Sequence, residues 1–493
     1  MDYISTRNNK ISVSSSFAIT HGIAADGGLF MPVGIPEFSA DDFENLCAMT
    51  YIERAAFVLK KYLTDFSDDE IRACVEGAYT RSFENDNPAP LAALGADIRV
   101  IELWHGPTCA FKDLALQLLP YLMTTASKHV ADGKKIVIPV ATSGDTGKAA
   151  LEGFKDVENT EIIVFYPSDG VSPAQKLQMS TQEGSNVHVF GIVGNFDDAQ
   201  SGVKRIFTDE SVIGKLAANG YEFSSANSIN WGRLVPQIVY YISAYCDMKN
   251  EGVDLSDGFN ITVPTGNFGN ILAAYFAKAM GLPVNKLICA SNKNKILTDF
   301  INTGKYDKNR DFYTTISPSM DILISSNLER MLYLLSGDDN YVARLQNELM
   351  TAGCYEVADG IKNKLGEIFY GGYCDDAKTL ETISSLYHDF GYLCDTHTAV
   401  AVTVANEYKV KTGDKRPMVI ASTASPYKFT KSVLKALGEE VPEDEFEANG
   451  KLSAVTGVPV PSPIANLCGK KVRFAEVIDK SAIKDAVYSS LNM

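Results

Sequence analysis

The chain has 493 residues, which is enough for about two to four domains that each bury a core of their own. Hydrophobic residues make up 45% and charged residues 22%, a balance typical of a globular protein that excludes a disordered or membrane-spanning chain. The 45 Lys and Arg against 61 Asp and Glu give a net charge of −16, which argues against a surface that binds nucleic acid or anionic lipid, so any anionic ligand needs a local basic site.

The nine cysteines are scattered, with no C-x-x-C pair and no nearby histidine that would complete a zinc site. They are typical of reduced thiols, and because no H-E-x-x-H motif occurs either, we expect no metal. The first residues lack the apolar run of a signal peptide, and no stretch of about 18 apolar residues is found. We therefore expect a cytoplasmic protein.

Residues 1–95 combine loops with amphipathic helical patterns, the longest over residues 41–63, where apolar residues recur every three or four positions. This region is expected to be mainly helical and to end at the proline-bearing stretch at residues 84–97. Beyond it, short apolar runs rich in β-forming residues alternate with helical patterns. That order predicts stacked βαβ units and parallel sheets.

Strand-to-helix junctions are the informative places in such a fold, because ligands bind at the carboxyl ends of the strands. The first polar junction follows the predicted strand at 134–141 and reads TSGDTG over residues 142–147. A Walker A motif would need Gly at 142 and Ser or Thr at 149, so phosphate transfer is excluded. The free N–H groups of the next helix suit an anion such as a carboxylate, and an ordinary N-cap by Ser143 or Asp145 explains the pattern equally well.

The second junction reads TGNFGN over residues 265–270, between an apolar strand and a well-patterned helix. Glycines let backbone N–H groups approach a phosphate closely, and the helix dipole adds a favourable field. A plain tight turn is the alternative, although it would not need so many small and amide residues in a row. No G-x-G-x-x-G motif follows a strand, which argues against a dinucleotide pocket.

The third feature is Lys112, which opens a predicted helix directly after a Gly-Pro turn and an apolar Cys-Ala-Phe run. Burial disfavours the charged form of a lysine, which is how lysines become Schiff-base nucleophiles and bases. Most lysines at helix starts are merely solvated, which is the alternative here. Together, a lysine, a phosphate cup and a carboxylate-sized polar turn are what pyridoxal phosphate chemistry requires.

Several longer segments form a pattern that covers the chain from end to end. They are GIAADGGLFMP (22–32), HGPTCAFKDLALQ (105–117), ATSGDTGKAA (141–150), NSINWGRLVPQ (227–237), PTGNFGNILAAY (264–275), DTHTAVA (395–401) and STASPYKF (422–429). These segments resemble the threonine synthase family of fold type II pyridoxal-phosphate enzymes. The sequence departs from the family pattern at Ser425, where His is expected, and at Cys109 and Lys148, so these pocket walls bear on substrate preference.

The resemblance implies the fold. We expect an α/β protein of fold type II, with two open parallel-sheet α/β lobes, an N-terminal mainly helical region, and the cofactor between the lobes. The expected division is residues 1–95 for the helical region, 96–130 with 226–493 for the large pyridoxal-phosphate-binding lobe, and 131–225 for the small lobe.

The resemblance also implies an activity. It predicts a lyase of threonine biosynthesis that converts O-phospho-L-homoserine and water into L-threonine and phosphate, with pyridoxal 5'-phosphate as cofactor. The γ-phosphate is eliminated and water adds at Cβ, so the site must hold two phosphates at once. No nucleic-acid or membrane partner is expected, and the chain is expected to be a monomer or a homodimer.

The implied roles of the site residues follow the motifs. Lys112 would hold the cofactor through its amine and move protons at Cα and Cβ as general base and acid. Thr423 stands at the family position that meets the pyridine nitrogen. The implied contacts of the cofactor phosphate are Thr265, Gly266, Asn267, Phe268, Gly269 and Asn270. The implied substrate contacts are Ser143, Asp145, Thr146, Asn227, Ser228, Asn230 and Arg233.

Arg233, Asp145 and His397 have ionisable side chains, and each leaves more than one role open. Arg233 is implied to hold the substrate's phosphate, since arginine suits bidentate phosphate contact, and a surface ion pair is the alternative. Asp145 would face a carboxylate unfavourably, so it is expected to bind cap N–H groups or a proton-bearing partner. His397 is explained equally well as a site residue and as a buried, hydrogen-bonded histidine.

Two rival functions stay open from the sequence. The first is a phospholyase of the same fold, which would expel phosphate from a similar substrate but release a keto acid and ammonia. The second is a homologue that binds pyridoxal phosphate without turnover and serves as an interaction protein. Retention of Lys112 beside both phosphate motifs argues against the second.

Overall fold

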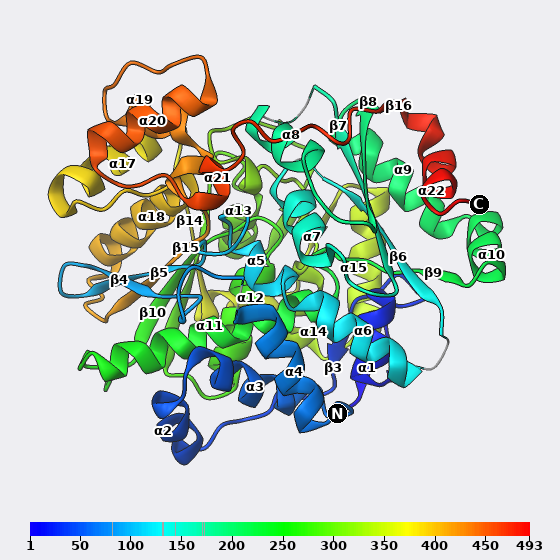
Figure 1. The fold of residues 1–493 in the computed structure, drawn as a ribbon. Helices are drawn as coiled ribbons and strands as arrows, with labels where there is room; N and C mark the ends of the chain where they lie inside the picture. Colours follow the sequence, from blue (N-terminus) through cyan, green and yellow to red (C-terminus); the bar gives the residue numbers. More distant parts are fainter. Residues whose placement is uncertain (81, 131–132, 143, 170, 172) are drawn as a thin grey trace.

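The computed structural model describes residues 1–493 except residues 81, 131–132, 143, 170 and 172. A larger and a smaller sheet of mainly parallel strands form its framework, each with helices packed on both faces (Figure 1). This arrangement is the α/β architecture that the alternating pattern predicts.

The larger sheet runs in the order β14-β11-β10-β15-β5-β4. Its strands are β4 (Leu91–Leu94), β5 (Ile98–Glu102), β10 (Phe259–Pro264), β11 (Val284–Ser291), β14 (Phe369–Tyr373) and β15 (Met418–Ser422). Neighbouring strands are parallel apart from β4, which is antiparallel to β5. All residues of β10 and β15 are buried, as expected for parallel strands covered on both faces.

The smaller sheet is parallel throughout and runs in the order β16-β8-β7-β6-β9. Its strands are β6 (Lys135–Ala141), β7 (Thr160–Pro167), β8 (Val187–Val193), β9 (Tyr221–Phe223) and β16 (Val477–Asp479). The helices packed on it are α7 (Asp145–Phe154), α8 (Pro173–Ser180), α9 (Phe196–Thr208), α10 (Glu210–Ala218) and α22 (Ile483–Ser490).

The N-terminal region is mainly helical, as predicted, and adds a small antiparallel sheet. Its elements are β1 (Tyr3–Ser5), β2 (Asn8–Val13), α1 (Ser15–His21), β3 (Phe30–Pro32), α2 (Ala40–Ala48), α3 (Tyr51–Tyr62) and α4 (Asp68–Tyr79). The continuous helical pattern at 41–63 divides into α2 and α3. The break occurs because Thr50 and Glu53 form a capping box, in which each side chain accepts the other residue's backbone N–H and so starts a new helix.

Further helices surround the larger sheet and join it to the smaller one. They are α5 (Lys112–Leu116), α6 (Leu119–Val130), α11 (Trp231–Asn250), α12 (Gly269–Ala279), α13 (Ile296–Thr303), α14 (Leu328–Ser336), α15 (Asp339–Thr351), α16 (Asp359–Ile368), α17 (Asp376–Phe390), α18 (Thr396–Thr412), α19 (Thr430–Ala436), α20 (Glu445–Thr456) and α21 (Ser462–Ala465). Short strands β12 (Lys305–Asp307) and β13 (Cys354–Glu356) pair with each other, and 3-10 turns lie at Pro318–Met320, Pro426–Lys428 and Lys480–Ala482. None of the helices in the described ranges is long and apolar enough to cross a membrane.

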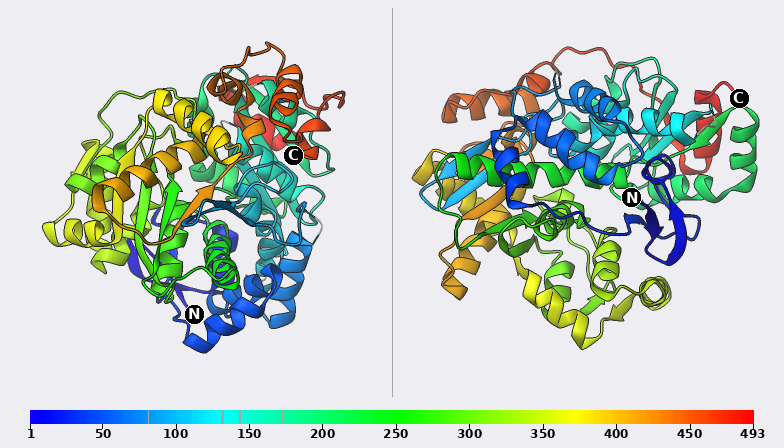
Figure 2. Two further views of the ribbon diagram at one scale, coloured as in Figure 1. Left: turned by 90° about the vertical axis from the view of Figure 1, so that its left-hand side faces the viewer. Right: turned by 90° about the horizontal axis from the view of Figure 1, so that it is seen from below.

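The C-terminal segment crosses from one lobe to the other. Strand β16 pairs with β8, and both views in Figure 2 show this red segment beside the smaller lobe. The expected boundaries place residues 226–493 in the large lobe, whereas this pairing puts β16 in the small one. By the same argument β4, which pairs with β5, belongs to the large lobe. We therefore propose the division 1–90, 91–130 with 226–472, and 131–225 with 473–493.

The ends of β5, β15 and β10 bring the predicted site together. These strands are neighbours and run parallel, so their carboxyl ends lie along one edge of the larger sheet. The loop before Lys112 follows β5, Thr423 follows β15, and residues 265–270 follow β10. Segments far apart in the sequence therefore meet at the edge where ligands of α/β sheets bind.

Gly153 lets α7 of the small lobe approach α5, the helix that begins at Lys112. A Cβ atom at Gly153 would lie 2.0 Å from the carbonyl oxygen of Leu116, which is backbone and has little freedom to move. We expect Gly153→Ala to lower the free energy of unfolding by about 1 to 3 kcal/mol through overpacking. Gly450→Ala in α20 is the control, since a Cβ there meets no described heavy atom within 4 Å, and it should be neutral or stabilise by up to about 1 kcal/mol. Urea unfolding measures both, and equal effects would contradict the close approach.

Candidate active site

Lys112 is held at the sheet edge by its loop. The N–H of Phe111 donates to the carbonyl of Thr423 at 2.9 Å, and the N–H of Ser425 donates to the carbonyl of Cys109 at 3.1 Å. These bonds form an isolated antiparallel bridge between Ala110 and Ala424, beyond the ends of the parallel strands β5 and β15. The structure thus places Lys112 and Thr423 side by side in the backbone framework.

Asp113 stiffens the same loop from inside. Its carboxylate accepts the N–H of Thr108 at 2.9 Å and the hydroxyl of Thr108 at 2.6 Å. Burial raises the pKa of Asp113 to about 6, although the bonds from Thr108 act in the opposite direction. Gly106 is required beside it, because a Cβ there would lie 2.6 Å from the Asp113 side chain.

The Lys112 amine lies in surroundings that favour its neutral form. Burial lowers the pKa of Lys112, and the positive charges of Lys428 and Arg233 lower it further, against the opposing effect of Asp145. A neutral amine is a nucleophile and a base, so the sequence-based assignment of Lys112 has the electrostatic setting it requires.

The polar turn at 142–147 forms the start of α7. The Thr142 hydroxyl accepts the N–H of Gly144 at 3.0 Å and the N–H of Gly147 at 2.9 Å, which closes the turn. Thr146 is partly exposed and Asp145 is buried. The predicted substrate contact of Ser143 lies outside the described residues.

Asp145 forms a buried ion pair that the sequence did not indicate. Its carboxylate lies 2.8 Å from the Lys428 ammonium, with about 5% of either side chain exposed, and it also accepts from Gln175 at 3.2 Å. Burial alone would raise the pKa of Asp145, but Lys428 and Lys112 outweigh it and lower that pKa. Lys428 stands in the STASPYKF segment and also donates to the carbonyl of Thr108, so it connects the two lobes. Asp145 thus has a proton-bearing partner.

The junction at 265–270 leaves the start of α12 open. Phe268 precedes the helix with φ of 63°, and within the described part of the chain no side chain caps it. The first N–H groups of α12 are therefore available to an anion. The rest of the loop is fixed, because the Ser325 hydroxyl donates to the carbonyl of Gly266 at 2.8 Å and the N–H of Asn327 donates to that of Asn267 at 3.0 Å.

Several buried donors near these loops have no protein partner in the described ranges, among them Nδ2 of Asn270 and Nε of Arg233. The Oδ1 atom of Asn270 is occupied, since it accepts from the hydroxyls of Tyr240 and Tyr241. Unpaired buried donors are unfavourable unless a ligand accepts from them. Asn270 lies at the uncapped start of α12, where its unpaired Nδ2 fits an anionic group such as a phosphate, whereas Arg233 lies at the start of α11.

Arg233 is buried, which removes the surface ion pair as its explanation. It is 3% exposed, donates to the carbonyl of Ala226, and forms no ion pair with a carboxylate of the described chain. Burial lowers its pKa to about 10. A buried cation of this kind is suited to a ligand that brings its own negative charge.

The asparagines of the NSINWGR segment have different roles. Asn230 is fully engaged: Nδ2 donates to the carbonyls of Ile19 and Ser225 at 2.9 and 2.8 Å, and Oδ1 accepts the N–H of Gly232 at 2.8 Å. The substrate contact of Asn230 stays a prediction, and we propose a positioning role for this residue instead, because Oδ1 caps α11 and Nδ2 is engaged by two carbonyls. Asn227 and Ser228 are partly exposed.

His397 acts on the protein itself. It is 2% exposed, its Nε2 accepts the N–H of Ser319 at 3.2 Å, and its Nδ1 donates to the Asp395 carboxylate at 2.8 Å. The carbonyl of Ser319 in turn lies 2.7 Å from where a Cβ on Gly266 would be. Of the two explanations for His397, the structure favours the buried, hydrogen-bonded histidine. Through Ser319, which lies beside Gly266, His397 supports the 265–270 loop.

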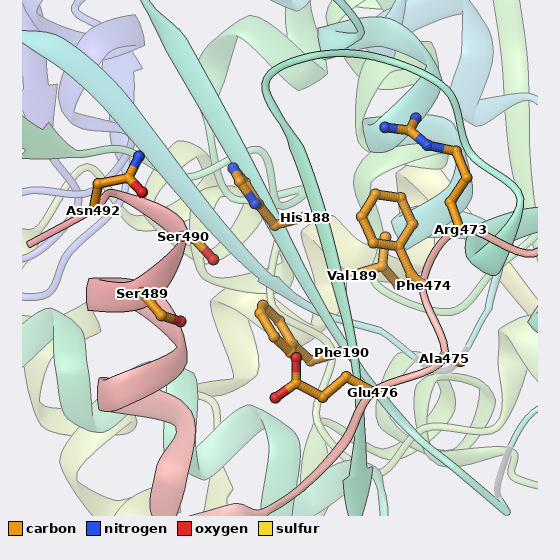
Figure 3. A pocket seen from close by; sticks show the side chains of 10 residues that line it. All are labelled: His188, Val189, Phe190, Arg473, Phe474, Ala475, Glu476, Ser489, Ser490 and Asn492. Atoms are coloured by element: carbon orange, nitrogen blue, oxygen red, sulfur yellow. The ribbon is translucent and has the colours of Figure 1, made fainter.

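Two open cavities lie away from these residues. One of about 470 Å³ lies between β8, residues 473–476 and the end of α22, where Figure 3 shows His188, Arg473 and Glu476 at its walls. Another, of about 630 Å³, lies between α17 and α18. As far as the described residues go, neither is lined by a predicted site residue. The convergence of side chains at the sheet edge therefore identifies the site better than cavity size does.

Family models match most of the chain. Those described as threonine synthase N terminus, pyridoxal-phosphate dependent enzyme, and threonine synthase, C-terminal match residues 2–79, 86–361 and 398–487. The chain belongs to the threonine synthase family of pyridoxal-phosphate dependent enzymes.

Relatives of this family differ in length. Threonine synthase of Pseudomonas aeruginosa is 39% identical over 440 residues, which cover 88% of this chain and 90% of that protein. Threonine synthase-like 1 of Homo sapiens is 40% identical over 455 residues, which cover 88% of this chain and 60% of that protein. The chain thus spans about 60% of the length of its threonine synthase-like 1 relatives.

Solved structures of family members confirm the predicted fold. The PLP-bound threonine synthase of Brucella melitensis has a TM-score of 0.89 at 37% identity, and covers 99% of both chains. The threonine synthase of yeast has a TM-score of 0.89 at 33% identity, over 100% of this chain and 99% of that one. The fold type II architecture inferred from the motifs is therefore correct.

The Asp145–Lys428 pair generates a prediction for stability. We expect Asp145→Asn to lower the free energy of unfolding at pH 7 by about 3 to 5 kcal/mol, because the buried ammonium of Lys428 loses its carboxylate. The pKa of Asp145 is lowered in the folded protein, so its contribution is complete above the unfolded pKa and is lost as pH falls through the folded one. The difference in the free energy of unfolding between Asp145→Asn and wild type should therefore become smaller below about pH 4.

Urea unfolding across this pH range measures the difference. Glu381→Gln is the control, since it breaks an exposed pair with Lys378 and should have little effect. A difference between Asp145→Asn and wild type that is the same at every pH would contradict the ion pair as its cause.

Proposed function

We propose that this chain is a threonine synthase, a lyase that converts O-phospho-L-homoserine and water into L-threonine and phosphate with pyridoxal 5'-phosphate as cofactor. The observation that carries the proposal is the position of Lys112. Its amine has a lowered pKa and shares the sheet edge with an open helix start and with Arg233, a buried cation that pairs with no carboxylate among the described residues. The relatives that support it are named threonine synthase and match this chain over nearly their whole length.

The residues at the sheet edge fit the cofactor. Lys112 would hold it through Nζ, residues 265–270 would hold its phosphate, and the hydroxyl of Thr423 would face its ring nitrogen. When bound, pyridoxal phosphate supplies an electron sink that stabilises negative charge at the substrate carbon. The phosphate has suitable donors, because the N–H groups at the start of α12 are uncapped and Nδ2 of Asn270 is unpaired in the described chain.

Lys112 also provides the acid–base chemistry. Elimination of the γ-phosphate and addition of water at Cβ need proton transfers at Cα and Cβ of the substrate. The Nζ atom of Lys112 would carry these protons, and burial lowers its pKa, which favours the neutral amine relative to that of an exposed lysine. The buried surroundings limit exchange of these protons with water.

The substrate would be held by its two anionic ends. Arg233, with Asn227 and Ser228, would hold the phosphate, because a buried guanidinium has paired donors that match phosphate oxygens. The carboxylate would lie at the start of α7, against its N–H groups and the hydroxyl of Thr146. Asp145 lies at the same helix start, but its negative charge is offset by the ammonium of Lys428, so it would not repel the substrate carboxylate.

The rest of the assignment stays a prediction. A role of Ser143 in holding the substrate carboxylate is proposed from the motif alone. A monomer or homodimer in the cytoplasm, without nucleic-acid or membrane partners, remains the expectation. The products test the activity: formation of L-threonine and phosphate supports the proposal, whereas release of a keto acid and ammonia would instead support the phospholyase.

Lys112→Ala tests the cofactor lysine. We expect the variant to stay folded but to lose both turnover and the visible absorbance of bound cofactor, because the neighbouring Lys428 is held in an ion pair and is not free to replace it. The exposed Lys10→Ala is the control and should retain both properties. If Lys112→Ala keeps its absorbance band and its activity, the assignment is wrong.

Arg233→Ala tests which phosphate the arginine holds. We expect the variant to keep the cofactor absorbance but to lose about 2 to 5 kcal/mol in kcat/KM for phosphohomoserine. Arg233→Lys, which keeps the charge without the paired donors, should lose less. The exposed Arg344→Ala is the control. A variant that loses the cofactor but turns over normally when cofactor is supplied in excess would show that the two phosphate sites are reversed.

A further inference from the structure

Residues 325–327, which precede α14, lie between the two proposed phosphate sites. On one side, the hydroxyl of Ser325 and the N–H of Asn327 bind the backbone of the 265–270 loop at 2.8 and 3.0 Å. On the other side, the Ser326 hydroxyl lies 3.5 Å from that of Ser228. This segment follows no strand of the larger sheet, and its sequence does not indicate a ligand site.

The Asn327 side chain is oriented by Arg330. Asn327 is fully buried, and its Oδ1 accepts a hydrogen bond from Nη1 of Arg330 at 2.5 Å. A guanidinium has donors only, so the atom that faces it must be the amide oxygen, which fixes the orientation of the amide. Nδ2 therefore points away from Arg330.

Arg330 is itself held firmly. It is fully buried and donates twice to the carbonyl of Phe30, at 2.9 and 2.8 Å, and also to that of Ile229. Its neighbour Glu329 pairs instead with Arg7, at 2.7 Å. The positive charge of Arg330 thus polarises the amide of Asn327, and this polarisation makes Nδ2 a stronger hydrogen-bond donor.

The Nδ2 atom of Asn327 points at the open start of α12. It has no hydrogen-bond partner among the residues that the structure describes. It lies 3.4 Å from the position that a Cβ on Gly269 would take, and Gly269 is the first residue of α12. A fully buried, unpaired donor beside an uncapped helix start needs an acceptor, and the ligand is the remaining source of one.

We propose that Asn327 is a further phosphate-binding residue, which donates from Nδ2 to the cofactor phosphate at the start of α12, with Arg330 as its positioning residue. The inference rests on the proposed function for the identity of the cofactor. Residues 265–270 contain no basic side chain. Arg330, acting through Asn327, therefore supplies positive polarisation to this phosphate without contacting it.

The test uses Asn327→Asp, which keeps an oxygen for Arg330 and replaces the donor by a second oxygen. The full-length protein, freed of cofactor, is titrated with pyridoxal phosphate and, separately, with pyridoxal, which lacks the phosphate. Absorbance of the bound ligand gives both Kd values. We expect the Kd for pyridoxal phosphate to rise about tenfold or more, and the Kd for pyridoxal to stay unchanged.

Two further variants keep the test decisive. A folded Asn327→Ala should bind pyridoxal phosphate more weakly and bind pyridoxal as wild type does. Asn327→Asp should unfold at the same or a higher urea concentration than wild type, because its carboxylate still accepts a hydrogen bond from Arg330. Asn449→Asp in α20 is the matched control, since this buried amide also accepts a bond through Oδ1, from Thr430, but lies outside the site. It should leave both Kd values unchanged.

The outcomes separate this inference from the proposed function. An unchanged ratio of the two Kd values in Asn327→Asp would overturn the inference. A variant in which only the binding of phosphohomoserine is weaker would overturn it too. A wild-type protein that binds pyridoxal phosphate but forms no threonine would refute the proposed function alone. A wild-type protein that binds pyridoxal no more weakly than pyridoxal phosphate would refute the phosphate site as a whole.

Discussion

A cluster of basic side chains with few acidic partners is the constraint on which the site depends. Lys112, Arg233 and Lys428 lie close enough to influence one another, and in the described chain only Lys428 has a carboxylate at ion-pair distance. Such an arrangement is unfavourable for the protein alone, because burial favours neutral forms and like charges repel. Anionic ligands would offset it. The overall charge of −16 would repel the phosphate-bearing ligands of the proposed function at long range, so they would need this local excess of positive charge.

Rigid supports around the edge keep these cations in place. Asp113 ties down the loop before Lys112, Asn230 fixes the start of α11, and Arg330 anchors residues near the 265–270 loop. Each support uses buried hydrogen bonds to backbone atoms. These bonds restrict the conformations of the segments that carry the basic side chains, so the side chains stay close together. The N-terminal region thus takes part in the site, since Arg330 binds the carbonyl of Phe30 and Asn230 binds that of Ile19.

The sequence predicted the parts of this site that follow buried strands. Lys112 and residues 265–270 could be recognised because an apolar run, a polar turn and a helical pattern are local features. Lys428 and Asn327 could not, since their roles depend on partners far along the chain. Arg330, which orients Asn327, is itself held by a carbonyl 300 residues away. Asn230 shows the converse: its residue type suited a ligand, but distant carbonyls occupy its amide.

Two departures from the family pattern, Cys109 and Ser425, lie against each other. The N–H of Ser425 donates to the carbonyl of Cys109 at 3.1 Å, and the Ser425 hydroxyl accepts the N–H of Tyr427. Burial raises the pKa of the Cys109 thiol to about 12, so it forms part of the wall and is not a nucleophile. Lys148, the third departure, is engaged with Glu152 and Gln182 in the small lobe. Cys109 and Ser425 thus meet through backbone atoms in the same loop that holds Lys112 beside Thr423, whereas Lys148 is engaged away from it.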